Sequence, residues 1–258
     1  MVPFALLLAC SAPPDAPREL DELVGYFFAH AVDEDEAPLA VGADNLASWM
    51  DTRLEETLDG YAVKVLSQAT LDSLDDRERP AAGLVGAAVG HESPHDSTRL
   101  AAGVLTTDAM DRDPEATLAY RRESDDDVAC FLDHACDVYT YRYWSTDSLP
   151  LGIEVTYQNI VQYRWFTMST GDAALVTRQW MVDPAELNVD WLEVDAQYYT
   201  WVSLPHGEGT RNMFALWAQT RLTGQDVPED LALSLAVGTM QDGGDKLDAW
   251  VEENPPRW

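Results

Sequence analysis

From residue 137 onward, the apolar residues of the sequence recur at every second position instead of every third or fourth, and this change of period constrains the fold most. In "VYTYRYWS", residues 138–145, the tyrosines occupy alternate positions. Alternate side chains of a β-strand lie on one face of the sheet, so the segment predicts a strand with an aromatic face. Similar segments follow after short turns, at 152–169, 172–182, 196–205 and 211–222. The sequence therefore predicts an antiparallel meander of about five or six strands.

Before this region the apolar residues have the spacing of amphipathic helices. The first predicted helix places one apolar stripe along a single face: Leu20, Leu23, Val24, Phe27 and Phe28. A second helix is predicted over 44–60 and a short strand over 61–67. After the meander, a C-terminal helix is predicted from residue 228 with an interruption at Gly243 and Gly244.

Helices, then antiparallel strands, then a final helix define an α+β fold. We predict a single domain over 18–253, with a helical part (18–136), a sheet part (137–222), a C-terminal helix (228–253) and a tail (254–258). This element order is similar to that of the helix-grip fold of START-like proteins. In that fold a curved sheet wraps around a C-terminal helix and encloses an apolar cavity. The resemblance implies such a cavity beneath residues 228–253.

The chain begins with an apolar run, "MVPFALLLAC", that stops at Cys10. A membrane-spanning helix needs about 20 apolar residues, so this shorter run is typical of a signal peptide. The letters LLAC at 7–10 resemble the lipobox of bacterial lipoprotein precursors. The resemblance implies removal of residues 1–9, a diacylglycerol on the Cys10 thiol, an acylated amine such as a palmitate amide, and a tether over 10–17. It also implies a location in the cell envelope, on the periplasmic face or the cell surface. The alternative is an ordinary buried segment.

The other two cysteines, Cys130 and Cys136, are close in sequence. If Cys10 carries lipid, these two are left as a pair in an oxidising compartment. Their spacing differs from the C-x-x-C of zinc and thioredoxin sites. We predict a disulfide that closes a short loop before the first strand of the meander.

The formal net charge is -30, from 46 acidic against 16 basic residues. Binding to nucleic acid requires clustered lysine and arginine to displace counterions from phosphates. The composition therefore excludes nucleic acid as a partner and is typical of a highly soluble surface.

Residues 91–95, His-Glu-Ser-Pro-His, match the H-E-x-x-H letters of zinc peptidases. In those enzymes both histidines bind one metal because they share a helical face. The proline opposes a helix through all five positions, at a cost of about 3 kcal/mol. The same letters favour a helix that begins inside the motif, with Ser93 as N-cap and Asp96 completing a capping box. The sequence thus predicts no metal shared by His91 and His95.

The aromatic residues of the meander exceed what one face of a sheet needs. Large exposed apolar patches are rare on soluble monomers, so both faces are expected to be covered. We predict a non-enzymatic lipoprotein that binds an apolar small molecule or a protein partner and needs no cofactor. The alternative function is a metal-dependent hydrolase that uses residues 91–95. The ligand-pocket candidates are Tyr141, Tyr143, Trp165, Trp180, Trp201 and Trp217.

The abrupt change of composition at Cys10 generates a direct test of the membrane anchor. A bacterial host fed a fatty-acid probe should label the wild-type protein, and Cys10→Ala should abolish the label because it removes the acylated thiol. Labelled protein is measured by gel fluorescence. Equal labelling of the two proteins would contradict the lipobox interpretation.

Overall fold

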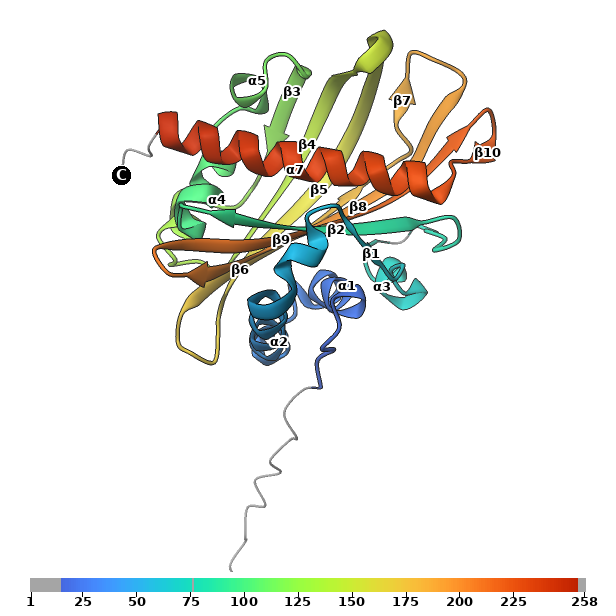
Figure 1. Cartoon of the computed structure of the whole chain (residues 1–258). Helices are drawn as coiled ribbons and strands as arrows, with labels where there is room; N and C mark the ends of the chain where they lie inside the picture. The colour runs from blue at the N-terminus through green and yellow to red at the C-terminus, as the bar shows by residue number, and fades with distance from the viewer. Residues whose placement is uncertain (1–14, 76, 255–258) are drawn as a thin grey trace, which may run out of the picture.

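The structure is a computed structural model that describes residues 15–75 and 77–254 (Figure 1). The predicted signal peptide and lipobox lie outside these residues. The helical elements are α1 (Leu20–His30), α2 (Ala37–Arg53), η1 (Leu54–Thr57), α3 (Gln68–Asp72), α4 (Ser97–Leu105), α5 (Ala109–Arg112), α6 (Val128–Leu132), η2 (Pro150–Gly152) and α7 (Glu229–Glu253). The strands are β1 (Tyr61–Val63), β2 (Val85–Ser93), β3 (Thr117–Glu123), β4 (Val138–Leu149), β5 (Ile153–Thr167), β6 (Ala173–Met181), β7 (Glu186–Leu187), β8 (Leu192–His206), β9 (Gly209–Leu222) and β10 (Gln225–Asp226).

The strands form one 10-stranded antiparallel sheet in the order β1-β2-β9-β8-β6-β5-β4-β3, with β10 beside β9 and β7 beside β5. Strands β4, β5, β6, β8 and β9 are neighbours in chain order, which confirms the predicted meander. The α+β class is confirmed as well, since helices precede the meander and α7 follows it. The number of strands exceeds the prediction because the N-terminal part of the chain also contributes strands.

Strands β2 and β3 lie within residues 18–136, where the sequence predicted mainly helices. Strand β2 has the small-residue sequence VGAAVGHES, which has only two valines and no aromatic residue among the types typical of strands. Its glycines are needed for packing: a Cβ at Gly86 would overlap the Trp217 indole, and one at Gly90 would overlap Leu54. Strand β3 lies at the sheet edge with most of its side chains exposed, so its apolar pattern is weak.

The sheet separates two hydrophobic cores, and the alternation of side chains along each strand assigns residues to one core or the other. On β9, Phe214 and Leu216 face the core that contains α7, whereas Ala215 and Trp217 face the core that contains α1. We call these two sides of the sheet the α7 face and the α1 face. Figure 1 shows α7 lying across one side of the sheet and α1 and α2 packed on the other. Both faces are therefore covered, as the aromatic content predicted.

The predicted first helix is confirmed as α1, and its whole apolar stripe is fully buried on the α1 face. Phe28 contacts the Tyr198 and Trp217 rings edge-on, with centroids 6.1 and 5.9 Å away. The second predicted helix forms as α2 and buries Trp49 and Met50 on the same side.

The C-terminal helix is continuous over Glu229–Glu253, so the predicted interruption at Gly243 and Gly244 was wrong. Of the two glycines, Gly244 lies where the helix closely approaches the sheet. A Cβ at Gly244 would lie 3.2 Å from the Phe214 ring and 3.3 Å from the His91 ring. Two glycines weaken a helix by about 1 kcal/mol each, and the burial of Ala236, Met240 and Val251 offsets that cost.

Cys130 and Cys136 form a disulfide with Cα atoms 5.3 Å apart. Cys130 belongs to α6, and Cys136 lies two residues before β4. The bond therefore fixes α6 against the start of the first strand of the meander. There Phe131 of α6 stacks on Trp165, with ring centroids 5.4 Å apart.

Replacing both disulfide cysteines by serine should lower the free energy of unfolding by about 2 kcal/mol, because the denatured chain regains the freedom of a short loop. Urea unfolding without reductant measures the loss, and reduced wild-type protein should behave like the double variant. Alkylation of unfolded, non-reduced wild-type protein should find neither Cys130 nor Cys136 as a free thiol. Two alkylated thiols at these positions would contradict the disulfide.

Candidate functional site

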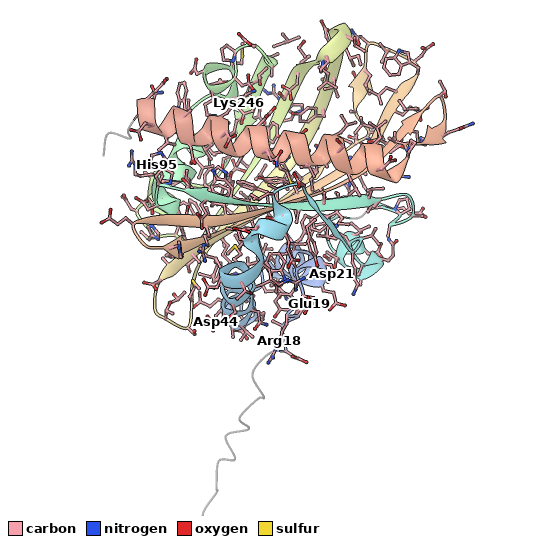
Figure 2. The ribbon with its side chains drawn as sticks, viewed as in Figure 1. Arg18, Glu19, Asp21, Asp44, His95 and Lys246 are labelled. Atoms are coloured by element: carbon pink, nitrogen blue, oxygen red, sulfur yellow. A yellow bond between two sulfur atoms is a disulfide. The ribbon has the colours of Figure 1, made fainter. Side chains whose placement is uncertain are left out.

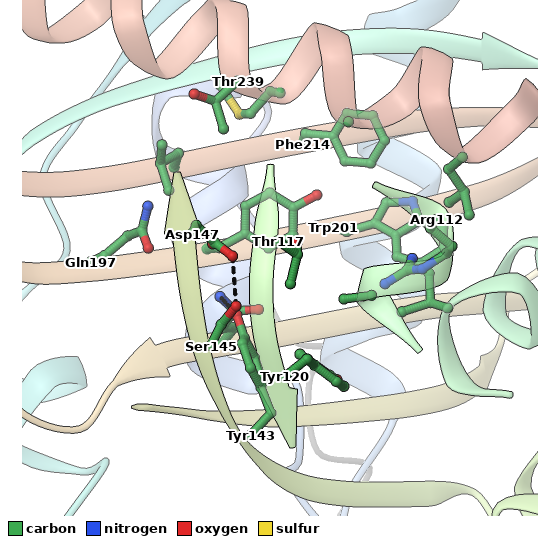
Figure 3. A pocket seen from close by; sticks show the side chains of 18 of the residues that line it. Arg112, Thr117, Tyr120, Tyr143, Ser145, Asp147, Gln197, Trp201, Phe214 and Thr239 are labelled. Atoms are coloured by element: carbon green, nitrogen blue, oxygen red, sulfur yellow. Dashed lines mark hydrogen bonds between the residues drawn. The ribbon is translucent and has the colours of Figure 1, made fainter. Parts of the chain in front are cut away.

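A cavity of about 360 Å³ lies between the α7 face of the sheet and helix α7. Figure 3 shows α7 above the cavity, with Thr239 on that helix. Arg112 and Trp201 lie toward one side of the cavity, and Gln197 and Asp147 lie toward the other. Binding pockets for small molecules have volumes of about 300 to 1,000 Å³, so this cavity is at the small end of that range. Six tyrosines line it: Tyr120, Tyr141, Tyr143, Tyr157, Tyr163 and Tyr199.

The register of the sheet brings the lining residues together from distant parts of the chain. One row of paired positions across the strands runs through Tyr141, Val161, Gln179, Tyr199 and Leu216. The next row of the same face contains Tyr163, Trp201 and Phe214, which are joined through Thr177 in β6. The floor of the cavity is thus a direct product of strand pairing.

Burial keeps the pocket phenols in their neutral form. It raises the pKa of Tyr141 and Tyr157 well above the ordinary value, and it also raises the pKa of Tyr143, Tyr163 and Tyr199. Desolvation dominates because ionisation would place a negative charge among aromatic rings. At neutral pH these hydroxyls can therefore donate hydrogen bonds to a ligand.

The polar groups around Asp147 form a connected cluster. Ser145 Oγ donates to Asp147 Oδ1 at 2.6 Å, and the Tyr157 hydroxyl donates to Oδ2. Nearby, the Tyr143 hydroxyl accepts from Asn159 Nδ2 at 2.6 Å and from Gln179 Nε2 at 3.1 Å. The Tyr143 oxygen thus accepts two bonds and keeps its own proton available for donation.

The six predicted pocket residues fall into three groups. Tyr141, Tyr143 and Trp201 line the cavity. Trp165 lies on the α7 face but not in the cavity: its Nε1 donates to the Phe131 carbonyl at 2.9 Å, and it borders a separate hollow of about 100 Å³.

Trp180 and Trp217 lie on the α1 face, away from the cavity. Neighbouring residues of a strand point to opposite faces of the sheet, so Gln179 and Leu216, one residue earlier than each tryptophan, line the cavity instead. The prediction selected residues by aromatic size, and only the phase along each strand separates the two faces.

Sequence reasoning missed Arg112, Asp147, Gln179 and Gln197 as pocket residues. Asp147 could have been found, because it continues the alternation of Tyr139, Tyr141 and Tyr143 along β4. Arg112 lies in α5, outside the sheet, and no periodicity links it to the strands.

Residues 91–95 do not form the helix that the zinc-peptidase motif requires. His91, Glu92 and Ser93 belong to strand β2, and helix α4 begins only at Ser97. The predicted N-cap was therefore wrong: Asp96 caps α4 and accepts a hydrogen bond from the Arg99 N–H at 2.9 Å. Strand pairing between β2 and β9 extends as far as Ser93, and this delays the helix by three residues.

Glu92, which would be the base of a zinc peptidase, is engaged elsewhere. Its carboxylate pairs with the Arg211 guanidinium at 2.9 Å. Among the described residues, no group of three or more His, Cys, Asp and Glu side chains is arranged to hold a metal ion.

The two histidines instead contact α7 through Asp248. The Asp248 carboxylate lies 2.8 Å from His91 Nε2 and accepts from Ser93 Oγ at 2.6 Å. His95 Nε2 lies 3.3 Å from the Asp248 carbonyl oxygen. Figure 2 shows His95 beneath the C-terminal part of α7. We call His91, Ser93, His95 and Asp248 the α7 latch.

The hydrogen bond to Asp248 raises the pKa of His91 above its ordinary value of 6.5, against the opposing effect of burial. Asp245 of α7, 3.8 Å from His91 Nδ1, adds a further carboxylate that favours the charged ring. The latch is thus strongest when His91 is protonated.

No helix within the described residues is long and apolar enough to cross a lipid bilayer. No protein-family model matches the sequence, and no curated protein matches it significantly.

Several solved structures are similar to this chain, and their names include START-like proteins, whose element order the sequence resembles. A STAR-related lipid transfer protein from Xanthomonas axonopodis is 13% identical, with a TM-score of 0.41, over 67% of this chain and 96% of that one. A START superfamily protein from Mycobacterium smegmatis is 12% identical, with a TM-score of 0.41, over 65% and 97%. Human StAR-related lipid transfer protein 5 is 10% identical, with a TM-score of 0.40, over 85% and 99%.

The α7 latch predicts a pH-dependent contribution to stability. Because the folded-state pKa of His91 is raised, the contribution is fully present below about pH 6.5 and is lost as the pH rises through the folded-state pKa. Asp248→Asn should therefore cost on the order of 1 kcal/mol more in acid than in alkali. Urea unfolding of both proteins from about pH 5.5 to about pH 9 measures the difference.

The bond from Ser93 supplies a remainder that does not depend on pH in this range. His91→Gln should change the pH dependence less in the Asp248→Asn background than in the parent, because only the exposed Asp245 then favours the charged ring. A stability difference that stayed constant with pH would contradict the His91 contact.

Proposed function

We propose that this protein binds a small molecule with an apolar body in the cavity between the sheet and α7, without performing chemistry on it. The observation that carries the proposal is the partly open cavity itself, with its aromatic floor and with α7 over it. A fully packed interior would have filled this space, since protein cores leave few voids larger than a water molecule.

The lining supports binding over catalysis. Its tyrosines have raised pKa values, so none of them is a base near neutral pH. The Asp147 carboxylate already accepts hydrogen bonds from Ser145 and Tyr157. These groups can orient a ligand through hydrogen bonds while the rings of Trp201 and Phe214 contact its apolar surface.

The position of the aromatic residues favours a small molecule over a protein partner. Trp201 is 3% exposed and Phe214 is 5% exposed, because α7 covers them. Rings buried in this way do not offer a surface on which another protein can dock.

For the N-terminus, we propose that a lipid on Cys10 holds the domain at a bacterial membrane. This part of the proposal rests on the sequence alone. A tethered binding domain would keep its ligand site close to the bilayer.

Filling the cavity tests the binding site. Gly243 lines the cavity, and a Cβ built there meets no atom within 4 Å. Gly243 is exposed and lies at the rim of the cavity, so in Gly243→Phe the new ring should cover part of the cavity mouth and weaken ligand binding by roughly tenfold or more. The readout is the fluorescence of the neutral apolar probe N-phenylnaphthylamine during titration of the soluble Cys10→Ala protein.

Gly238→Phe is the matched control, because Gly238 lies on the same helix, is exposed and does not line the cavity. It should bind the probe as the parent protein does. Absence of saturable binding to the parent, with this probe and with a panel of fatty acids and sterols, would refute the proposed function. Equal binding by both glycine variants would place the probe outside this cavity.

A further inference from the structure

Arg112, the last residue of α5, lines the cavity with a guanidinium that has no acidic partner within the described part of the chain. Its Nε is buried and, among those residues, has no hydrogen-bond partner. A buried donor without a partner is costly, and a charged one more so, unless something else satisfies it.

The acids beside Arg112 in the sequence are directed elsewhere. Asp113 pairs with Lys246 of α7, with an Nζ to Oδ2 distance of 2.5 Å. Asp108 caps α5 by accepting from the Met110 N–H at 3.0 Å. Asp111 is exposed. The local sequence is thus rich in carboxylates, but none of these three pairs with Arg112, whose side chain lines the cavity.

The cavity has a positive side and a negative side. The charge of Arg122, which lies 5.4 Å from the Tyr141 ring centroid and donates to the Val104 carbonyl, opposes the rise in the pKa values of Tyr120 and Tyr141 that burial causes. The charge of Arg112 acts in the same direction on these two tyrosines and on Tyr163. The charge of Asp147 acts instead on Tyr143 and Tyr157, adding to the rise that burial causes. Figure 3 likewise shows Arg112 and Asp147 on different sides of the cavity.

We infer that the ligand is an amphipathic carboxylic acid whose carboxylate binds Arg112 and whose apolar body lies on the Trp201 and Phe214 rings. This inference rests on the proposed function. A carboxylate can accept two parallel hydrogen bonds from one edge of a guanidinium, and the edge that includes Nε is the one left without a partner. A neutral headgroup would leave the Arg112 charge uncompensated in a partly buried site.

The net charge of -30 does not prevent this binding. At physiological salt, exposed charges are screened beyond about 8 Å, so most surface acids contribute little inside the cavity. The charges that line the cavity instead determine where a carboxylate binds. Asp147 sets the orientation of the ligand because it repels a carboxylate from its own side of the cavity. The apolar body can be an alkyl chain or an aromatic ring.

Matched acids and amides test the inference, because an amide has the shape of the acid without its charge. Decanoate against decanamide and cinnamate against cinnamamide are titrated as competitors of N-phenylnaphthylamine on the soluble Cys10→Ala protein. The parent should bind at least one acid about ten- to a hundredfold more tightly than its amide, the usual range for a hydrogen bond to a charged group. The pair with the larger preference identifies the apolar body as alkyl or aromatic.

Arg112→Gln should lower acid affinity much more than amide affinity and so remove most of this preference, and Arg112→Lys should retain part of it because the charge remains. Arg142→Gln is the control: it makes the same change of charge on β4, where Arg142 is exposed and follows Tyr141 on the opposite face. Thermal unfolding checks that each variant is folded.

Amide binding as tight as acid binding in the parent would overturn the carboxylate inference and leave the proposed function intact. An equal loss of preference in Arg112→Gln and Arg142→Gln would also overturn it. Failure of the probe, the acids and the amides alike to bind would refute the proposed function, and the inference with it.

Discussion

Burial of both faces of one antiparallel sheet is the constraint on which the rest of this structure depends. A sheet exposed on one side can carry polar residues there, but here strands β5, β6, β8 and β9 supply apolar side chains to two cores. The chain must therefore provide helices for both sides. Helices α1 and α2 cover one face from the N-terminal side of the sequence, and α7 returns to cover the other.

The helices on the two faces of the sheet pack differently, and this difference leaves the cavity. On the α1 face, α1 packs against the sheet with fully buried phenylalanines and leaves a dense core. On the α7 face, a single long helix crosses a broad sheet whose strands carry tyrosines with polar ends. Hydroxyl groups resist close apolar packing because each needs a hydrogen-bond partner, so space remains beneath the helix. The same hydroxyls then become the polar groups that a ligand would meet.

Much of this fold could be predicted from the sequence, because periodicity reports which side chains share a face. The stripe from Leu20 to Phe28 indicated α1, and the alternation of Tyr139, Tyr141 and Tyr143 indicated a strand of the meander. Strand β2 could not be recognised in this way, since its glycines and alanines fit against Trp217 and Leu54 and have no pattern of their own. The cavity was implied only by the order of elements. Arg112 and Asp248 meet their neighbours through contacts between distant elements, which no local pattern records.

The glycine pair of α7 has a consequence for how the partly open cavity can exchange its contents. Helix propensity is low at the adjacent Gly243 and Gly244, and Gly243 lies directly at the cavity. Segments with weak local stability open more often than their surroundings in the native state. The latch at Asp248 holds the C-terminal portion of the helix, and buried residues such as Ala236 and Met240 hold the portion before the glycines. Transient opening would thus concentrate at one turn above the cavity, so that a molecule could pass without separation of the whole helix from the sheet.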